Sequence, residues 1–274
     1  MSGLLAFHAH PDDETISMGG TMAKYAAAGI PVVVVTATDG ALGEVHNYED
    51  PEPIRERLGE VRAEELRAAL DILGVEENEF LGYRDSGMMG WESNLHPNCF
   101  WQADPQVAAA KLVSLIRKYQ PEVMTIYDPH GGYGHPDHIN VHRIGIDAFY
   151  AGDDLTRFPL KDGEAPWRPA SLYMNAWSRK RRVAWADIRL ERGMIDEETA
   201  ALMRRSGTPD DMVTTWVDVR DHLETKLTAL RAHRTQIPPD WFMLTIPDEM
   251  KPEVLGTETF VRVFGASVGE TDLF

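Results

Sequence analysis

Short apolar runs alternate with longer amphipathic stretches through the first half of the chain. The apolar runs predict buried strands at residues 4–9, 31–37, 79–81 and 122–127. Apolar residues at helical spacing predict helices at 14–29, 54–74, 105–119 and 136–150. Asp12 or Asp13 could cap the first of these helices, and Gly29 could end it. This alternation predicts an α/β fold, a Rossmann-like sandwich in which helices cover both faces of a parallel sheet.

The pattern weakens after Gly152. Residues 153–169 predict a long loop, because they are rich in Asp, Pro and Gly. Strands are expected at 171–177, 212–219 and 259–263, and a helix at 220–233. We therefore predict two units. Residues 1–152 form a Rossmann-like catalytic core, and residues 153–274 form a smaller α+β extension that completes the fold and the substrate pocket.

Charge and cysteine content narrow the class of protein. The 274 residues include 44 acidic and 27 basic side chains, for a net charge of −17. This balance disfavours nucleic acid and anionic membranes as partners, because both attract basic surfaces. The single cysteine, Cys99, excludes an intrachain disulfide and is compatible with a reducing compartment. Because the first apolar run stops at His8 and no run approaches the ~20 residues of a membrane span, we expect a cytoplasmic protein without a signal peptide. A homo-oligomer is left open.

Imidazoles and carboxylates gather in two short segments, 8–14 and 135–138. Both segments lie at predicted turns from strand to helix, where parallel sheets bind their ligands. Such side chains suit zinc or iron, and a catalytic zinc takes three protein ligands and leaves one position open for water. A role in starting helices would explain the aspartates but not the histidines. The pattern therefore predicts a metal site with spare groups for proton transfer, and it leaves open which residues bind the ion.

The sequences AHPDDE at 9–14 and GGYGHPDH at 131–138 resemble the two motifs of the LmbE/PIG-L family of zinc N-deacetylases. The resemblance covers roughly residues 3–150. Three further pieces, RDSG at 84–87, HRTQI at 233–237 and TDLF at 271–274, are similar to the mycothiol branch of that family. That branch comprises N-acetylglucosaminyl-inositol deacetylases and mycothiol S-conjugate amidases.

The resemblance implies a role for each residue of the two motifs. One zinc ion per chain, with iron as the alternative, would be bound by His10, Asp13 and His138. Asp12 matches the general base, His135 the imidazole beside the leaving group, and Asp137 the carboxylate that orients this imidazole. Tyr133 matches a tyrosine that polarises the amide carbonyl. Three more residues are candidates for gripping the sugar, namely Arg62, Asp85 and, less strongly, Glu44.

We therefore expect a zinc-dependent hydrolase that cleaves the amide bond of a small N-acylated glucosamine-type substrate. Two alternatives are kept: a mycothiol S-conjugate amidase, and a non-catalytic metal-containing carbohydrate-binding protein. The loops at 82–104 and 152–170 and the C-terminal tail are expected to decide between substrates. Trp91 and Trp101 could wall the pocket. The basic run at 179–182 predicts either a solvated helix start or a grip on an anionic substrate group.

Overall fold

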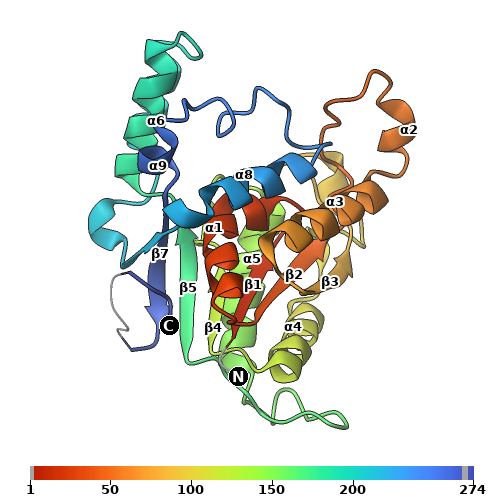
Figure 1. Cartoon of the computed structure of the whole chain (residues 1–274). Helices are drawn as coiled ribbons and strands as arrows, with labels where there is room; N and C mark the ends of the chain where they lie inside the picture. The colour runs from red at the N-terminus through yellow and green to blue at the C-terminus, as the bar shows by residue number, and fades with distance from the viewer. Residues whose placement is uncertain (1–2, 267–270) are drawn as a thin grey trace.

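The computed structural model describes residues 3–266 and 271–274. Within them, seven strands form one sheet in the order β3-β2-β1-β4-β5-β7-β6 (Figure 1). The parallel strands are β1 (Leu4–His8), β2 (Val32–Thr38), β3 (Glu77–Tyr83), β4 (Val123–Ile126) and β5 (Ser171–Ala176). Strand β7 (Thr257–Phe264) pairs antiparallel with both β5 and β6 (Thr215–Asp218). The α/β expectation is confirmed, but the sheet is mixed rather than wholly parallel.

Helices cover both faces of the sheet (Figure 1). On one face, α4 (Pro105–Tyr119) and α5 (Pro136–Ala151) pack on alternate side chains of the central strands. On the other face lie α1 (Asp13–Ala27), α3 (Leu58–Leu73) and α8 (Leu223–Ala232). Strands buried on both faces read as continuous apolar runs, which is why β1 and β2 were evident from sequence.

Several elements differ from the expectation. The helix expected over 54–74 is two helices, α2 (Glu52–Arg55) and α3, because Arg57 leaves helical geometry at φ −126°. A hairpin of α6 (Arg179–Glu191) and α7 (Glu197–Arg205) was not foreseen beyond its first residues. The remaining short elements are α9 (Lys251–Val254), η1 (Glu92–Leu95), η2 (Phe100–Gln102), η3 (Asp210–Met212) and η4 (Arg220–His222). Within residues 3–266 and 271–274, no helix combines the length and apolar character needed to cross a membrane.

The C-terminal part of the chain shares the sheet with the N-terminal part. Strand β5, beyond residue 152, pairs directly with β4 before it. The loop at 153–170 lies at the amino ends of the strands, where the buried Arg117 of α4 donates to Gly152 O and Phe158 O. The division at residue 152 stays a prediction, but the strands on its two sides form one hydrogen-bonded layer.

Helix α1 is broken at Met18, whose φ of −145° and ψ of 23° are not helical. Two buried side chains from the C-terminal part bridge the break. Glu258 accepts from the backbone amides of Gly20 and Thr21, at 3.0 and 2.7 Å, and Lys226 donates to Ile16 O at 3.0 Å. The break leaves backbone N–H groups without helical partners on one side and a backbone carbonyl on the other. The ion pair of Lys226 and Glu258 satisfies both. Gly20 is required here, because a Cβ would lie 2.7 Å from Val219 Cβ.

Lys226→Met should lower the free energy of unfolding by about 3–5 kcal/mol, because it leaves Glu258 buried without its partner. Lys226 and Glu258 are each 1% exposed, and their charged atoms lie 2.5 Å apart. Lys118→Met is the matched control. It removes an exposed pair to Glu79 with an N–O distance of 2.6 Å, which is worth at most about 1 kcal/mol. Urea denaturation of the three proteins measures the difference, and equal losses in the two variants would contradict a role for burial.

Candidate active site

A cavity of about 580 Å³ opens at the carboxyl ends of the parallel strands. The turn after β1, the loops after β2 and β3, and the turn before α5 all contribute to its wall. Its polar lining includes residues from both sequence motifs and from the loop after β3: His10, Asp12, Asp13, Asp85, His135 and His138. The expectation that the two motifs converge at this edge of the sheet is confirmed.

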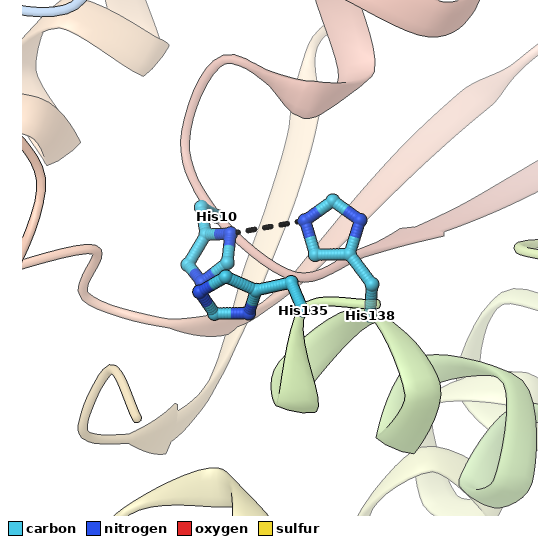
Figure 2. Close-up of side chains that lie close together, drawn as sticks. All are labelled: His10, His135 and His138. Atoms are coloured by element: carbon cyan, nitrogen blue, oxygen red, sulfur yellow. Dashed lines mark hydrogen bonds between the residues drawn. The ribbon is translucent and has the colours of Figure 1, made fainter. Parts of the chain in front are cut away.

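Three ligand atoms in this cavity form a nearly equilateral triangle. His10 Nδ1 lies 3.3 Å from Asp13 Oδ2, Asp13 Oδ2 lies 3.3 Å from His138 Nε2, and the two imidazole nitrogens lie 3.3 Å apart. The dashed line in Figure 2 joins these nitrogens. Two ligands of a tetrahedral zinc, each about 2.0–2.1 Å from the ion, are separated by about 3.3–3.4 Å. The triangle therefore has the dimensions of three ligands around one ion, with a fourth position left open.

Two other groups of buried side chains also bring ligand atoms within 4.8 Å of one another. One is His10, His135 and His138, and the other is His10, Asp85, His135 and Asp137. We favour the triangle because His10 Nε2 already has carboxylate neighbours, Asp137 at 3.2 Å and Asp85 at 3.5 Å. A carboxylate on the outer nitrogen is the usual way in which a metal-binding histidine is oriented.

The resemblance implied that Asp137 orients His135, but among the described residues no hydrogen bond joins the Asp137 carboxylate to that imidazole. Its carboxylate contacts His10 Nε2, accepts from Ser86 N at 2.9 Å and accepts from the Ser86 hydroxyl. The hydrogen bond between residues 135 and 137 is instead local, from the Asp137 backbone amide to His135 Nδ1 at 3.2 Å. His135 caps helix α5 in this way, and this fixes its ring without help from a carboxylate.

Asp137→Asn should therefore weaken metal affinity about 10–100-fold, the usual effect of losing a partner of a metal-binding imidazole. A titration against a chelator of known affinity measures this. The competing role, orientation of His135, predicts unchanged metal affinity together with reduced turnover, so the two roles are distinguishable in one protein.

Asp12 stands at the N-terminal boundary of α1 but does not cap it. Its backbone φ of 118° is rare for a residue with a side chain and costs on the order of 1–3 kcal/mol. The carboxylate instead turns into the cavity, 3.2 Å from the Arg62 guanidinium. Burial raises the pKa of Asp12 to about 6, although the charge of Arg62 opposes this. A pKa in that range suits a general base that works near neutral pH.

The three candidate sugar contacts all line the cavity, in different settings. Arg62 is buried and donates to Gly40 O at 2.7 Å and to Pro11 O at 2.5 Å. Asp85 is also buried and accepts from the amides of Gly87 and Leu42, at 2.8 and 3.1 Å. The Glu44 side chain is 85% exposed at the rim. Much of the hydrogen-bonding capacity of Arg62 and Asp85 is thus used within the protein.

His135 and Tyr133 flank the triangle. Because His135 Nδ1 accepts a backbone N–H, the proton of the neutral ring is on Nε2. Burial lowers the pKa of His135 to about 4, and the neighbouring His10 and His138 act in the same direction. Tyr133 is 58% exposed, and its hydroxyl lies 3.5 Å from His138 Nε2. The loop bends sharply here, since a Cβ on Gly131 (φ 64°) would lie 2.5 Å from His138 Cβ.

Some contributors had no recognisable local signal in the sequence. The ring of Tyr127 stacks on His138, with centroids 4.6 Å apart and planes at 17°. Trp91 lines the cavity as expected, but Trp101 does not and lies under Arg143 instead. Of the basic run, Arg182 reaches the cavity. The loop at 152–170, expected to help select the substrate, supplies none of the described lining; the C-terminal part contributes Asn175, Trp177, Arg182 and Gln236.

The family model for PIG-L, GlcNAc-PI de-N-acetylase, matches residues 5–149. A 1D-myo-inositol 2-acetamido-2-deoxy-alpha-D-glucopyranoside deacetylase from Thermomonospora curvata is 47% identical, over 85% of this chain and 80% of its own length. The protein of the same name from Thermobifida fusca is 42% identical, over 99% of this chain and 98% of its own.

Among solved structures, N,N'-diacetylchitobiose deacetylase from Pyrococcus horikoshii is similar, with a TM-score of 0.67, 23% identity and coverage of 98% of this chain and 86% of that one. The 4-carboxy-2-hydroxymuconate hydratase of Pseudomonas putida has a TM-score of 0.62 at 20% identity, over 99% of this chain and 100% of that one. One fold thus serves a deacetylase and a hydratase, so these two likenesses establish the fold alone.

Proposed function

Because this chain belongs to the PIG-L family of GlcNAc-PI de-N-acetylases, we propose that it hydrolyses the N-acetyl amide of a glucosaminyl-inositol. The substrate is that of the relatives named above, a small amino-sugar amide. The observation that carries the proposal is the triangle of His10, Asp13 and His138, in the same cavity as Asp12.

Cytoplasmic location and homo-oligomeric assembly stay predictions from the sequence. Light scattering after gel filtration measures the oligomeric state.

The proposed ion is zinc, one per chain, held by His10 Nδ1, Asp13 Oδ2 and His138 Nε2. Iron is the second choice for a donor set of two nitrogens and one oxygen. When bound, zinc supplies Lewis acidity that polarises the acyl oxygen and acidifies a water molecule. Asp137 and Asp85, on the outer nitrogen of His10, hold that imidazole in place.

Asp12 is proposed to accept the proton of the attacking water. It neighbours Asp13, it faces the cavity, and its pKa of about 6 leaves it mostly ionised at neutral pH while still basic enough to take a proton. Arg62 holds the carboxylate at 3.2 Å and keeps it from turning away. This assignment makes Arg62 a support for Asp12 as well as a candidate contact for a sugar hydroxyl.

The departing nitrogen must gain a proton, or the tetrahedral intermediate collapses back to the amide. Asp12, once protonated by the attacking water, is the proton source, so the proton taken from water is handed to the amine. His135 is neutral and assists by donating a hydrogen bond from its Nε2–H, because its Nδ1 is occupied by the Asp137 amide. We propose that Asp85 and Glu44 accept hydrogen bonds from sugar hydroxyls. For Asp85 this requires the substrate to displace part of its present bonding to the Gly87 and Leu42 amides.

Tyr133→Phe should lower kcat about 10²–10³-fold, with a smaller change in KM. The variant removes the hydroxyl beside His138 and keeps the ring. We propose that this hydroxyl donates to the oxygen that becomes negative as the amide is attacked, a bond stronger in the transition state than in the ground state. Steady-state kinetics on metal-loaded protein tests this, and an effect on KM alone would make Tyr133 a simple substrate contact.

The proposed function is tested by offering the protein two substrates and identifying the products by mass spectrometry. N-acetylglucosaminyl-inositol should yield acetate and the free amine, and this activity should disappear with a chelator and return with added zinc. Cleavage of a mycothiol S-conjugate in its place would identify the conjugate amidase. Binding of both compounds without cleavage by the zinc-loaded protein would favour the carbohydrate-binding alternative.

A further inference from the structure

The backbone of Asp12 has an unfavourable conformation, and the side-chain carboxylate of Glu14 accepts a hydrogen bond from it. Its amide N–H donates to Glu14 Oε2 at 2.9 Å. No side-chain cap supports this end of α1, and φ is 118° at Asp12. The direction of the Asp12 side chain follows from this backbone, so whatever fixes the amide also aims the carboxylate.

Glu14 is fully buried, and its other oxygen has two partners. Thr15 Oγ1 donates to Oε1 at 2.5 Å, and His233 Nε2 lies 3.0 Å from the same oxygen. Since an ionised carboxylate only accepts hydrogen bonds, His233 Nε2 is the donor. His233 is also fully buried, and its Nδ1 has no hydrogen-bond partner among the described residues. The polar contacts of the His233 ring are therefore both made by Nε2: one to Glu14 Oε1 at 3.0 Å and a longer one to Thr15 Oγ1 at 3.4 Å.

We propose that Glu14 and His233 form a positioning pair that holds Asp12 in its working conformation, so that the C-terminal part of the chain sets the geometry of the base. This rests on the proposed function of Asp12. Asp12 is then fixed from two sides. Arg62 holds its carboxylate at 3.2 Å, and the pair holds its amide. Neither Glu14 nor His233 lines the cavity, so neither is a catalytic residue.

A second buried carboxylate, Glu65, also binds the segment that carries His233, but its role is structural alone. Glu65 of α3 is buried and accepts from the Thr235 amide at 2.9 Å and from its hydroxyl at 2.7 Å. Glu65 and Glu14 therefore hold the same C-terminal segment, two residues apart, but only Glu14 contacts Asp12. Comparing the two carboxylates separates fastening from positioning.

In the test, Glu14→Gln is compared with Glu65→Gln by kinetics on the amino-sugar amide, by metal content and by thermal unfolding. Glu14→Gln should lower kcat roughly 10- to 100-fold, the scale on which small misplacements of a reacting group act. Its KM should stay within about threefold and its metal content at the wild-type level. Glu65→Gln should keep kcat within about threefold, whatever its effect on unfolding temperature. For His233, His233→Gln retains a donor near the Nε2 position and should keep more activity than His233→Leu.

A double-variant cycle decides whether Glu14 acts through Asp12. In an Asp12→Ala background, adding Glu14→Gln should change the surviving kcat by less than about threefold, because the group it positions is gone. Three results would overturn the inference: wild-type kcat in metal-loaded Glu14→Gln, loss of metal in that variant, or equal losses with and without Asp12. If Glu14→Gln does not fold, the pair His233→Gln and His233→Leu carries the same cycle. A wild-type protein inactive on every amide would instead refute the proposed function, which is a separate outcome.

Discussion

Removing either His10 or Asp13 should yield a protein that neither retains metal nor hydrolyses the amide. Each supplies one corner of the 3.3 Å triangle, and two ligands leave an incomplete site. His10→Ala and Asp13→Ala should therefore fall from about one ion per chain to near zero after gel filtration, measured by elemental analysis. Activity should be lost to the same extent, because the remaining groups cannot polarise the acyl oxygen by themselves.

The two variants also separate the competing ligand sets. His10 belongs to every one of them, whereas Asp13 belongs only to the triangle. Metal retained in Asp13→Ala but lost in His10→Ala would move the ion to one of the sets that contain His135. His222→Ala serves as the control, since this half-buried histidine lies in η4, outside the cavity lining, and should keep the metal.

The central strands and the convergence of the two motifs could be predicted from the sequence, for one physical reason. A strand covered on both faces is buried along its whole length and is mostly apolar, as in β1 and β2, so its position can be read locally. The connection from each such strand then emerges at the carboxyl edge of the sheet. The convergence of the segments that carry His10 and His138 follows from that rule, whereas the 3.3 Å between their ring nitrogens is set by side-chain packing in the folded structure.

The remainder depends on contacts between distant parts of the chain. Helix α6 is too polar to show a clear apolar face, with four consecutive basic residues at its start. Strand β7 inserts between β5 and β6 although it follows both in sequence, and pairing order has no local signature. The contact between the Asp137 carboxylate and His10 had no local signal either, because His10 lies 127 residues away, while the sequence neighbour His135 is engaged by the helix cap.

Helix α1 shows how these distant contacts bear on the site. The C-terminal part holds it at two points, through Lys226 and Glu258 at the break and through His233 near the amino end. The helix begins with Asp13, a corner of the triangle, and follows Asp12 directly. The region after residue 152 therefore contacts the helix that follows Asp12 and carries Asp13, in addition to supplying part of the cavity wall.

Replacing Asp12 should leave the metal bound while kcat falls about 10²–10⁴-fold, the usual contribution of a positioned general base. Asp12→Asn is the sharper variant. It keeps the side-chain shape and an oxygen for Arg62, which lies 3.2 Å from the carboxylate, and it removes only the ability to take a proton. Asp12→Ala should lose at least as much rate and should also lose stability, because Arg62 is buried and would be left without its carboxylate.

Kinetics on protein of verified metal content make the measurement, so that loss of a base is not confused with loss of an ion. Asp71→Asn is the matched control: it removes an aspartate paired with Arg67 on the surface of α3, at 2.6 Å, and should leave kcat unchanged. The Asp12 side chain forms no hydrogen bond with the three ligand atoms of His10, Asp13 and His138, so its replacement should leave their arrangement unchanged. A metal-loaded Asp12→Asn protein within about threefold of the wild-type kcat would exclude Asp12 as the base.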